Sequence, residues 1–543
     1  MSTIHRPSVV LTDLSFAWPD ATPVFSGLTA AFNSGRTGLI GDNGCGKSTL
    51  LRIIAGQLRP TGGTVTVSGT VGWLPQNLTL RPFMTVAELL GIDRKLAALR
   101  AIEAGSVAVA DFDALGTDWD IDARARAALD SAGLEDLSLD RPVGTLSGGE
   151  TVLTALTGLR LAGDSVVLLD EPTNNLDRAA RQRLYDTITA WAGALIVVSH
   201  DVALLELMDD TAELYDGSLS VFGGPYSAYR AHLEAEQEAA AQALRTAEQQ
   251  LRREQRQRVE AQPKLARRQR YARTDFENKR KPKMIMNQRK TEAQVSAGKL
   301  RGELDAKVTA AQESADQQSE RIRSDHRIII DLPDPDVHSG RRLAELRSAT
   351  GASVVVQGPQ RIALTGANGI GKTQLVASLL QPRSGGQATP QVEAIAHTNR
   401  IGLLPQRLDH LADDQSILDT VASAAPGTPP GQLRKRLARF QFRAETVHRL
   451  LGDLSGGERF RVALAALLLA DPPHQLLVLD EPTNSLDLSS VDALVSALED
   501  YRGGLIIVSH DDAFLSRCQP DTWLELDTTG LHRIDPPVPQ ENS

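Results

Sequence analysis

Two copies of an Asp-Glu pair give the chain its clearest chemical signal. Asp170-Glu171 and Asp480-Glu481 each end an apolar run, and each is followed by Pro-Thr-Asn and a further Asp. Buried carboxylates normally pair with a cation or bind a metal, and such a pair beside a phosphate loop suits Mg²⁺-nucleotide chemistry. A strand running into a solvated acidic turn would explain one pair, but the second copy argues against that alternative.

Two glycine-rich loops occur upstream of these pairs. Residues 41–49 read GDNGCGKST and residues 366–373 read GANGIGKT, each after an apolar run and before a helical pattern. Glycines let backbone N–H groups surround phosphates, the lysine adds charge, and the hydroxyl suits Mg²⁺. A glycine turn with a solvated lysine is the weaker alternative. We expect the phosphate-binding residues to be Gly41, Asn43, Gly44, Gly46, Lys47, Ser48, Thr49, Gly366, Asn368, Gly369, Gly371, Lys372 and Thr373.

Further polar residues recur at matching positions in the two halves. Glu171 and Glu481 are the candidate catalytic bases, because a carboxylate beside the Mg²⁺ ligand can orient the attacking water. His200 and His510 each lie 30 residues after the Asp of their pair, and this equal offset favours a γ-phosphate contact over a structural role. The predicted Mg²⁺ ligands are Ser48, Gln76 and Asp170 in the first half, and Thr373, Gln406 and Asp480 in the second.

Trp18 is the candidate for stacking on an adenine ring. It follows a predicted strand, although rim packing explains an aromatic residue there equally well. No aromatic residue occurs in 342–360, so the sequence offers no corresponding ring for the second half. A ring that stacks on adenine is therefore predicted for the first half alone, and base recognition in the second half is left open.

These side chains require strands and helices that place them at one edge of a sheet. Apolar runs at 37–40, 166–169 and 195–198 in the first half, and at 361–364, 476–479 and 505–508 in the second, are typical of buried parallel strands. The pattern predicts an α/β protein with two cassettes, at residues 1–225 and 326–530, followed by a flexible tail at 531–543.

Residues 226–325 form a predicted basic helical connector. Residues 226–262 lack Gly and Pro, which indicates one long helix; Pro263 is expected to kink it, and a hairpin tip is expected at 279–288 with a return helix over 289–323. Between Arg252 and Arg301 there are 17 Lys or Arg against 5 acidic residues, in a chain of net charge −10. Such a projection suits one polyanion, with RNA the leading candidate over a merely solvated helix. The residues expected to contact RNA are Arg267, Arg268, Arg270, Lys279, Arg280, Lys281, Lys283, Arg289 and Lys290.

Composition narrows the class of protein. The 543 residues are 41% hydrophobic and 23% charged, and the longest apolar run near the sites, 462–470, is shorter than the ~20 residues of a membrane helix. No secretory signal pattern is visible, and Cys45 and Cys518 are too few for a disulfide framework. A cytoplasmic location and no membrane domain are expected.

The motifs together resemble the ATP-binding cassette superfamily. LSGGE at 146–150 and 454–458 is similar to its signature, and Asn175-Leu176-Asp177 and Ser485-Leu486-Asp487 resemble its D-loops. The resemblance implies two ATP molecules, with Mg²⁺, sandwiched between the cassettes of a monomer, so that Lys47 would face Ser455, Gly456 and Gly457, and Lys372 would face Ser147, Gly148 and Gly149. Arg461, three residues past the second signature, is Leu153 in the first.

The tandem arrangement with a basic helical connector resembles the ABC-F family of ribosome-associated ATPases. Gly224-Pro225-Tyr226-Ser227-Ala228-Tyr229 is also similar to a motif near the end of that family's first cassette. The resemblance implies that the connector enters the ribosomal E site and reaches toward the P-site tRNA and the peptidyl-transferase centre. It implies a role in antibiotic ribosomal protection or in translation regulation, and the long connector favours the former.

Three other readings compete with this one. The ATPase subunit of a transporter with separate membrane chains would not need a basic connector of about 100 residues. A DNA-repair ATPase of the zinc-module class, and an iron-sulfur ribosome-recycling ATPase, would need more cysteines than two.

Overall fold

The computed structural model describes residues 8–76, 83–174, 176–277, 283–321, 332–348, 353–380, 392–406, 408, 411–440, 442, 444–484 and 486–536. The chain forms two compact units. One contains both cassettes, residues 1–226 and 326–543, and the other contains residues 227–325.

The first cassette is built on a six-stranded sheet, in the order β5-β6-β7-β3-β8-β9. Strands β5, β6, β7, β3 and β8 run parallel to one another, and β9 is antiparallel to β8. The strands are β3 (Arg36–Ile40), β5 (Val71–Leu74), β6 (Val166–Asp170), β7 (Ala194–Val198), β8 (Asp210–Tyr215) and β9 (Ser218–Gly223). A separate antiparallel sheet, β2-β1-β4, contains β1 (Val9–Ala17), β2 (Pro23–Phe32) and β4 (Gly62–Val67).

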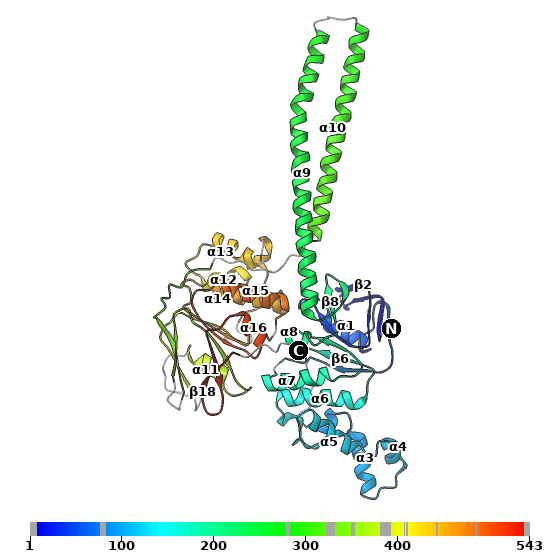
Figure 1. Ribbon diagram of the computed structural model, residues 1–543, viewed down its shortest axis with the longest axis vertical. Helices are drawn as coiled ribbons and strands as arrows, with labels where there is room; N and C mark the ends of the chain where they lie inside the picture. The colour runs from blue at the N-terminus through cyan, green and yellow to red at the C-terminus, as the bar shows by residue number, and fades with distance from the viewer. Residues whose placement is uncertain are drawn as a thin grey trace. The chain divides into compact units, whose positions relative to one another are not determined.

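Helices cover this sheet because its strands are apolar on both faces. Along β6, Val166 and Leu168 pack into one core and Val167 and Leu169 into another, and all are fully buried. Alternating side chains therefore demand a cover on each side. The helices are α1 (Lys47–Ile54), α2 (Val86–Leu89), α3 (Asp93–Glu103), α4 (Val109–Leu115), α5 (Ile121–Ser131), α6 (Gly148–Ala162), α7 (Arg178–Thr189) and α8 (Val202–Leu205). Figure 1 shows α6 and α7 beside β6.

The second cassette repeats this topology. Its sheet has the order β14-β15-β16-β12-β17-β18, and its antiparallel sheet the order β11-β10-β13. The strands are β10 (Arg342–Ser348), β11 (Ser353–Gln357), β12 (Arg361–Thr365), β13 (Val392–Ala396), β14 (Ile401–Leu404), β15 (Leu476–Asp480), β16 (Gly504–Val508), β17 (Thr522–Leu526) and β18 (Leu531–Ile534). The helices are α11 (Lys372–Ser378), α12 (Ile417–Ala424), α13 (Pro430–Leu437), α14 (Gly456–Leu468), α15 (Leu488–Glu499) and α16 (Asp512–Arg517).

Strand β18 corrects one sequence-based expectation. Residues 531–534 were assigned to the flexible tail, but they pair antiparallel with β17, and Leu531 is only 4% exposed. The Asp527 side chain accepts hydrogen bonds from the N–H groups of Thr529 and Gly530, which closes the turn between the two strands. Residues 537–543 lie outside the described part of the chain.

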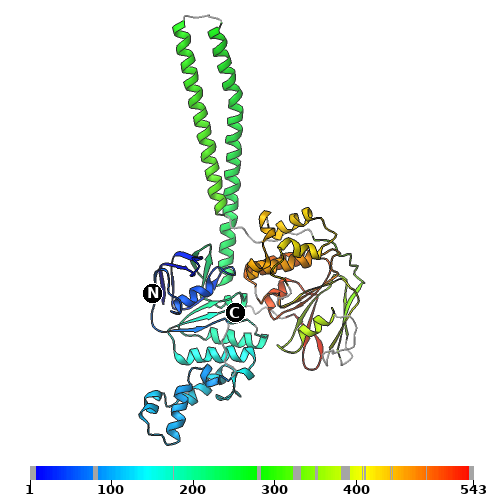
Figure 2. The same cartoon turned by 180° about the vertical axis from the view of Figure 1, so that it is seen from behind.

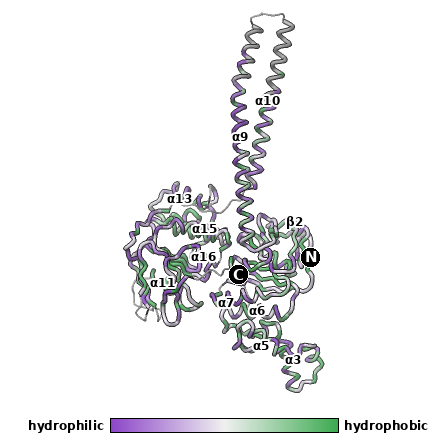
Figure 3. The backbone as a smooth tube through the Cα atoms, in the orientation of Figure 1, coloured by the Kyte–Doolittle hydropathy of each residue, from purple (hydrophilic) through white to green (hydrophobic). Residues whose placement is uncertain are grey.

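The second unit is a pair of long helices. Helix α9 (Tyr226–Glu277) and helix α10 (Lys283–Glu320) lie side by side in opposite directions, as the two views in Figures 1 and 2 show. The Arg258 Nε lies 2.8 Å from Asp305 Oδ1 across the pair, and the described part of α9 is largely hydrophilic (Figure 3). Antiparallel packing of the two helices thus forms a helical hairpin.

The hairpin differs from its prediction at the start of the return helix. Pro263 lies inside α9, which continues to Glu277, and the kink predicted at this proline stays a prediction. A proline removes one backbone hydrogen bond, and the many turns on either side retain theirs. The return helix begins at Lys283, directly after Pro282, rather than at 289, and residues 284–286 are therefore helical instead of belonging to the tip. Residues 278–282 lie outside the described part.

Candidate functional site

Each phosphate loop lies between the end of a central strand and the start of a helix. Helix α1 begins at Lys47 after Gly46, whose φ is 106°, and α11 begins at Lys372 after Gly371, whose φ is 105°. Only glycine adopts this left-handed conformation readily. The loops therefore point the N–H groups of a helix N-terminus at one place, as a phosphate-binding site requires.

Both loops also lie against a neighbouring strand at very short range. A Cβ on Gly41 would lie 2.4 Å from the carbonyl oxygen of Leu214 in β8, and one on Gly366 would lie 2.2 Å from that of Leu526 in β17. No larger residue fits either position without moving the backbone. The first glycine of each loop is thus fixed by packing as well as by conformation.

The loop lysines are buried and held by the loop's own carbonyl groups. Lys47 Nζ donates to the carbonyl oxygens of Gly41 at 2.6 Å and Asp42 at 3.0 Å. Lys372 Nζ donates to those of Gly366 at 2.6 Å and Ala367 at 3.1 Å, and it lies 2.9 Å from His510 Nε2. Each ammonium group is positioned inside its loop before any phosphate arrives.

The glutamate of each Asp-Glu pair adopts a strained backbone conformation. Glu171 has φ 50° and Glu481 has φ 46°, in the left-handed region that costs a residue with a side chain roughly 1–2 kcal/mol. Their N–H groups donate to the carbonyl oxygens of Val198 and Val508, both at 2.8 Å, at the ends of the neighbouring strands. Strain of this kind gathers at functional sites, and here it occurs at the same place in both cassettes.

Burial is the largest effect on the pKa values of the glutamate and histidine side chains in both clefts. It raises the pKa of Glu171 to about 8 and that of Glu481 to about 7, against the lowering effect of the loop lysines. Burial, with the same lysines, lowers the pKa of His200 and of His510 to about 3. Both imidazoles are therefore neutral near pH 7 and keep one nitrogen as an acceptor.

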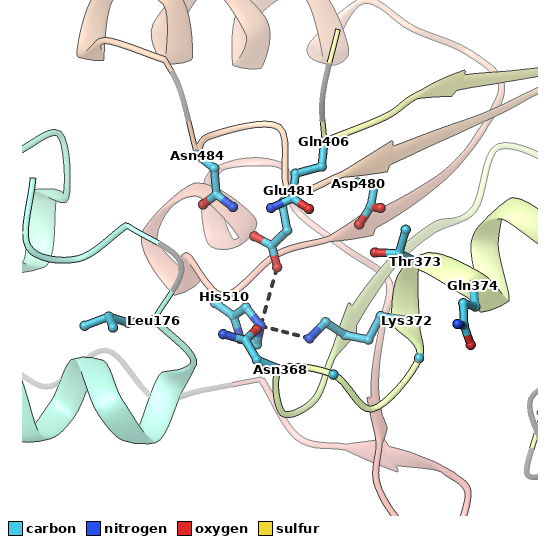
Figure 4. Close-up of a pocket in the computed structure, with 12 residues that line it drawn as sticks. Leu176, Asn368, Lys372, Thr373, Gln374, Gln406, Asp480, Glu481, Asn484 and His510 are labelled. Atoms are coloured by element: carbon cyan, nitrogen blue, oxygen red, sulfur yellow. Dashed lines mark hydrogen bonds and ion pairs between the residues drawn. The ribbon is translucent and has the colours of Figure 1, made fainter. Parts of the chain in front are cut away.

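Each histidine lies next to the glutamate of its own cassette. His200 Nε2 is 3.2 Å from Glu171 Oε1, and His510 Nε2 is 3.5 Å from Glu481 Oε1. Figure 4 shows dashed contacts from His510 to Glu481 and to Lys372, with Asp480 and Thr373 next to each other near Lys372. The predicted catalytic residues are thus brought together in each cassette.

The aspartates face the hydroxyl groups of the phosphate loops. The Ser48 hydroxyl donates a hydrogen bond to the Asp170 carboxylate, and the Thr373 hydroxyl donates one to the Asp480 carboxylate. Burial has the largest effect on both aspartates and raises the pKa of each carboxyl group. The Oδ1 atom of each aspartate is buried and has no hydrogen-bond partner among the described residues. A hydroxyl and a carboxylate oxygen with spare capacity, with Gln76 or Gln406 in the same cleft, form a donor set that fits Mg²⁺.

Residues of both cassettes line the first cleft. Its lining consists of Asn43, Gly44, Gly46, Lys47, Ser48, Thr49, Gln76, Asp170, Glu171, Asn174, Val198 and His200 from the first cassette, and Gly456, Thr483, Asn484 and Leu486 from the second. The second cleft is lined by Asn368, Gly369, Gly371, Lys372, Thr373, Gln374, Gln406, Asp480, Glu481, Asn484 and His510, with Leu176 from the first cassette. Figure 4 shows Leu176 on a separate segment opposite His510.

Hydrogen bonds join the two cassettes at the first cleft. The N–H of Asn43 donates to Asp487 Oδ2 at 2.8 Å, and Ser489 Oγ donates to Asp42 Oδ1 at 2.9 Å. The first phosphate loop is therefore tied to the turn that ends at Asp487 in the other cassette.

The signature motifs are helix caps. Ser147 and Ser455 accept hydrogen bonds from the N–H groups of Glu150 and Glu458, whose side chains accept from the serine N–H groups in return. Within the described residues, Gly456 lines the first cleft, whereas Ser455 and Gly457 do not, and Ser147, Gly148 and Gly149 do not line the second.

Other predicted contact residues are not among the described lining residues of the clefts. Trp18 packs edge-on against Phe16, with ring centroids 5.1 Å apart, and is not part of the described lining of the first cleft. On the hairpin, Arg267 and Arg270 are exposed on α9, Arg268 is on α9, and Lys283, Arg289 and Lys290 are on α10. The predicted RNA contacts Lys279, Arg280 and Lys281 fall outside the described residues.

The sequence prediction missed the asparagine of the Pro-Thr-Asn turns. Asn174 and Asn484 both line clefts, and Asn484 lines both. The repeated Pro-Thr-Asn itself was the available signal. The polar pair Asp42 and Ser489 gave no such signal, because each is alanine in the other copy.

None of the helices in the described part of the chain has the length and apolar content that crossing a lipid bilayer requires.

The fold and the two clefts define a tandem-cassette P-loop ATPase.

Comparison with known proteins specifies the family. The ABC transporter family profile matches residues 26–174 and 350–484. The tylosin resistance ATP-binding protein TlrC of Streptomyces fradiae is 32% identical over 534 residues, which cover 92% of this chain and 94% of TlrC. The ATP-binding protein Uup of Caulobacter vibrioides is 30% identical over 537 residues, which cover 97% and 79%. A solved structure titled RNase-L Inhibitor has the same fold, with a TM-score of 0.52, 18% identity, and coverage of 96% of this chain and 90% of that one.

The chain belongs to the ATP-binding cassette family and, within it, to the tandem-cassette ABC-F type. It binds ATP and is an ATPase.

Proposed function

We propose that this protein is an ATP-gated ribosome-binding factor. ATP bound in the two clefts draws the cassettes together, and the basic hairpin then enters the ribosome near the E site and reaches toward the P-site tRNA and the peptidyl-transferase centre. The observation that carries the proposal is the segregation of charge: 17 basic against 5 acidic residues within 252–301, in a chain of net charge −10. A polyanion is the partner such a segment selects.

Antibiotic protection of the ribosome is the role we favour within this function. The similarity to TlrC, whose name records tylosin resistance, supports it, since it extends over 94% of that protein. Regulation of translation is the second role the ABC-F family offers. The protein acts as a monomer in the cytoplasm, where its ribosomal partner lies.

Hydrolysis is assigned to the duplicated residues of the clefts. Glu171 and Glu481 orient the attacking water and, in their ionised form, accept its proton, and His200 and His510, being neutral, hold the γ-phosphate side of each cleft. Lys47 and Lys372 neutralise phosphate charge, while Trp18 stacks on the adenine at the first cleft.

Magnesium fits the same clefts. Ser48, Gln76 and Asp170 would hold it in the first, and Thr373, Gln406 and Asp480 in the second. It would neutralise charge on the phosphate oxygens during phosphoryl transfer. The chain's own residues place the carboxylate and hydroxyl oxygens of this ligand set before nucleotide binds.

Co-sedimentation tests the proposal. The double variant Glu171→Gln/Glu481→Gln binds ATP but hydrolyses it slowly, so it is expected to sediment with ribosomes in ATP and to remain in the supernatant without it. Recovery with a membrane fraction instead would favour a transporter subunit. Absence from ribosomes in ATP would refute the proposal.

A charge variant locates the binding surface. Arg267→Gln/Arg268→Gln/Arg270→Gln on α9 should weaken ribosome binding about tenfold or more and reduce its salt dependence, since each phosphate contact contributes to the salt slope. The matched control is Arg434→Gln/Lys435→Gln/Arg436→Gln on α13, three consecutive basic residues of the second cassette. Equal loss in both variants would mean that binding depends on overall charge alone.

A further inference from the structure

One face of α7 joins the two cassettes through charged residues. Arg178 Nη2 lies 3.1 Å from Asp512 Oδ2, which belongs to the second cassette. One turn further along, the Arg181 side chain is only 11% exposed, and its Nη1 lies 3.6 Å from Asp201 Oδ2. Tyr185 donates its hydroxyl hydrogen to the same oxygen at 2.6 Å. Residues 178, 181 and 185 share a helix face, so α7 presents a charged edge to the second cassette.

Arg181 lies one helical turn from the Arg178–Asp512 contact, and Asp512 follows His510 of the second cleft by two residues. The charge of Arg181, after that of Lys372, opposes the effect of burial on the pKa of Glu481, and it also lowers the pKa of Asp511, which burial raises. The Arg181 Nε atom is buried and has no hydrogen-bond partner in the described part of the chain. The first cassette thus supplies a buried cation, with an unused donor, next to the contact between α7 and the segment that follows His510.

The equivalent place at the first cleft has no such charge. Counting from Asp177 and Asp487, the positions of Arg178, Arg181 and Tyr185 are taken in α15 by Leu488, Val491 and Val495, and the position of Asp512 is taken by Val202. Val491 is 8% exposed. Lys47 is the cation that acts on Glu171. The face of α15 is therefore apolar at the three positions where the matching face of α7 carries Arg178, Arg181 and Tyr185.

We infer that Arg181 is a positioning residue, contributed by the first cassette to the second ATP cleft, and that hydrolysis at the second cleft depends on it while hydrolysis at the first does not. A guanidinium stays charged at all relevant pH values, and its planar shape allows it to face several acceptors at once. Held by Asp201 in its own cassette, it fixes the edge of the cleft where Glu481 and His510 lie. Separation of the cassettes removes this cation from the second cleft alone.

The inference rests on the proposed catalytic roles of Glu171 and Glu481, which supply its test. In a Glu171→Gln background the remaining ATP turnover comes from the second cleft, and in a Glu481→Gln background it comes from the first. Arg181→Val copies the residue found at the equivalent position, Val491. We expect it to lower kcat about tenfold in the Glu171→Gln background, with less than a twofold change in KM for ATP, and to change kcat less than twofold in the Glu481→Gln background.

Three further variants keep the test decisive. Arg181→Lys retains a cation and should recover part of the lost kcat. Arg183→Val, at an exposed position of the same helix, should change neither background. Arg181→Val/Asp201→Asn removes the buried acid together with the cation, retains a cap for α8, and should show the same dependence on background if Arg181→Val alone folds poorly.

Equal losses of kcat in the two backgrounds would show that Arg181 serves folding only, and no loss in the Glu171→Gln background would exclude the role altogether. If neither glutamate variant alone lowers turnover, the proposed catalytic bases are wrong and the inference falls with them.

Discussion

The two ATP clefts share their catalytic residues and differ in the contacts between cassettes. At the first cleft the cassettes meet through neutral and carboxylate hydrogen bonds, from the N–H of Asn43 to Asp487 and from Ser489 to Asp42. The residues equivalent to Ser489 and Asp42 are Ala179 and Ala367, so the second pair of groups is missing on the other side. The catalytic residues are therefore present in both copies, whereas the Ser489–Asp42 contact between the cassettes is present at the first cleft alone.

Beside the second cleft the cassettes instead meet through the ion pair of Arg178 and Asp512, one turn from the buried Arg181–Asp201 pair of the first cassette. Both partners of the buried pair belong to the first cassette and stay together when the cassettes separate, whereas the hydrogen bonds at the first cleft break, each worth about 1 kcal/mol. The difference implies that the clefts respond unequally to movement of one cassette against the other.

Removing a loop lysine tests whether the clefts bind nucleotide independently. Lys47→Ala and Lys372→Ala should each lower ATP affinity at their own cleft about 100-fold, because each removes a charged donor to phosphate. Titration with a fluorescent ATP analogue should then show one nucleotide per chain instead of two. The exposed Lys435→Ala is the control, and loss of both nucleotides in either variant would show that the clefts bind only together.

Replacing the first glycine of each loop tests whether the two scaffolds are equivalent. Gly41→Ala and Gly366→Ala place a methyl group within 2.4 Å and 2.2 Å of a backbone carbonyl oxygen. Each should lower the free energy of unfolding of its cassette by about 3 kcal/mol, measured by urea denaturation without nucleotide. Gly431→Ala, in a helix with open space around it, is the matched control. A large difference between the two loop variants would contradict a shared scaffold.

Ser489→Ala probes the contact that only the first cleft has. Loss of its hydrogen bond to Asp42 should cost about 1 kcal/mol and raise the ATP concentration for half-saturation of the first cleft roughly fivefold. The measurement uses the Glu171→Gln/Glu481→Gln double variant, in which ATP persists. Ser489→Thr keeps the hydroxyl and should bind normally, and a matching loss at the second cleft would disprove the assignment to the first.

The smallest expected effect concerns the signature serines. Ser147→Ala and Ser455→Ala each remove a helix cap, at about 1 kcal/mol of unfolding free energy in the absence of ATP. Because both serines form the same capping box, the two losses should be equal by thermal denaturation. Ser147→Asp and Ser455→Asp, which can still cap, should lose less.

The sequence was enough to predict the α/β cassettes and the lysine, hydroxyl, carboxylate, glutamine and histidine residues that line each cleft. Strands that are buried on both faces appear as continuous apolar runs, and β6, β7, β15 and β16 were recognised in this way. Internal repetition then separated meaningful polar residues, such as His200 and His510, from isolated ones.

Residues and elements that differ between the two cassettes, or that lack a repeated motif, could not be predicted from internal repetition. Arg181 has Val491 as its counterpart, so repetition gave it no support, and its importance appears only when α7 is placed beside Asp201 and the second cassette. Strand β18 was missed because a short pairing segment followed by prolines resembles a tail.

The order of strands in the two sheets also sets an order of assembly. Strand β3, which leads into the first phosphate loop, pairs with β7 and β8, and β12 pairs with β16 and β17. A nascent chain therefore holds every strand of the first cassette once Gly223 has emerged, before any of the hairpin exists. In the second cassette, more than 130 residues separate the end of β12 from the start of its partner β16. While those residues are synthesised, the apolar faces of β12 lack their partner strands and need protection from aggregation.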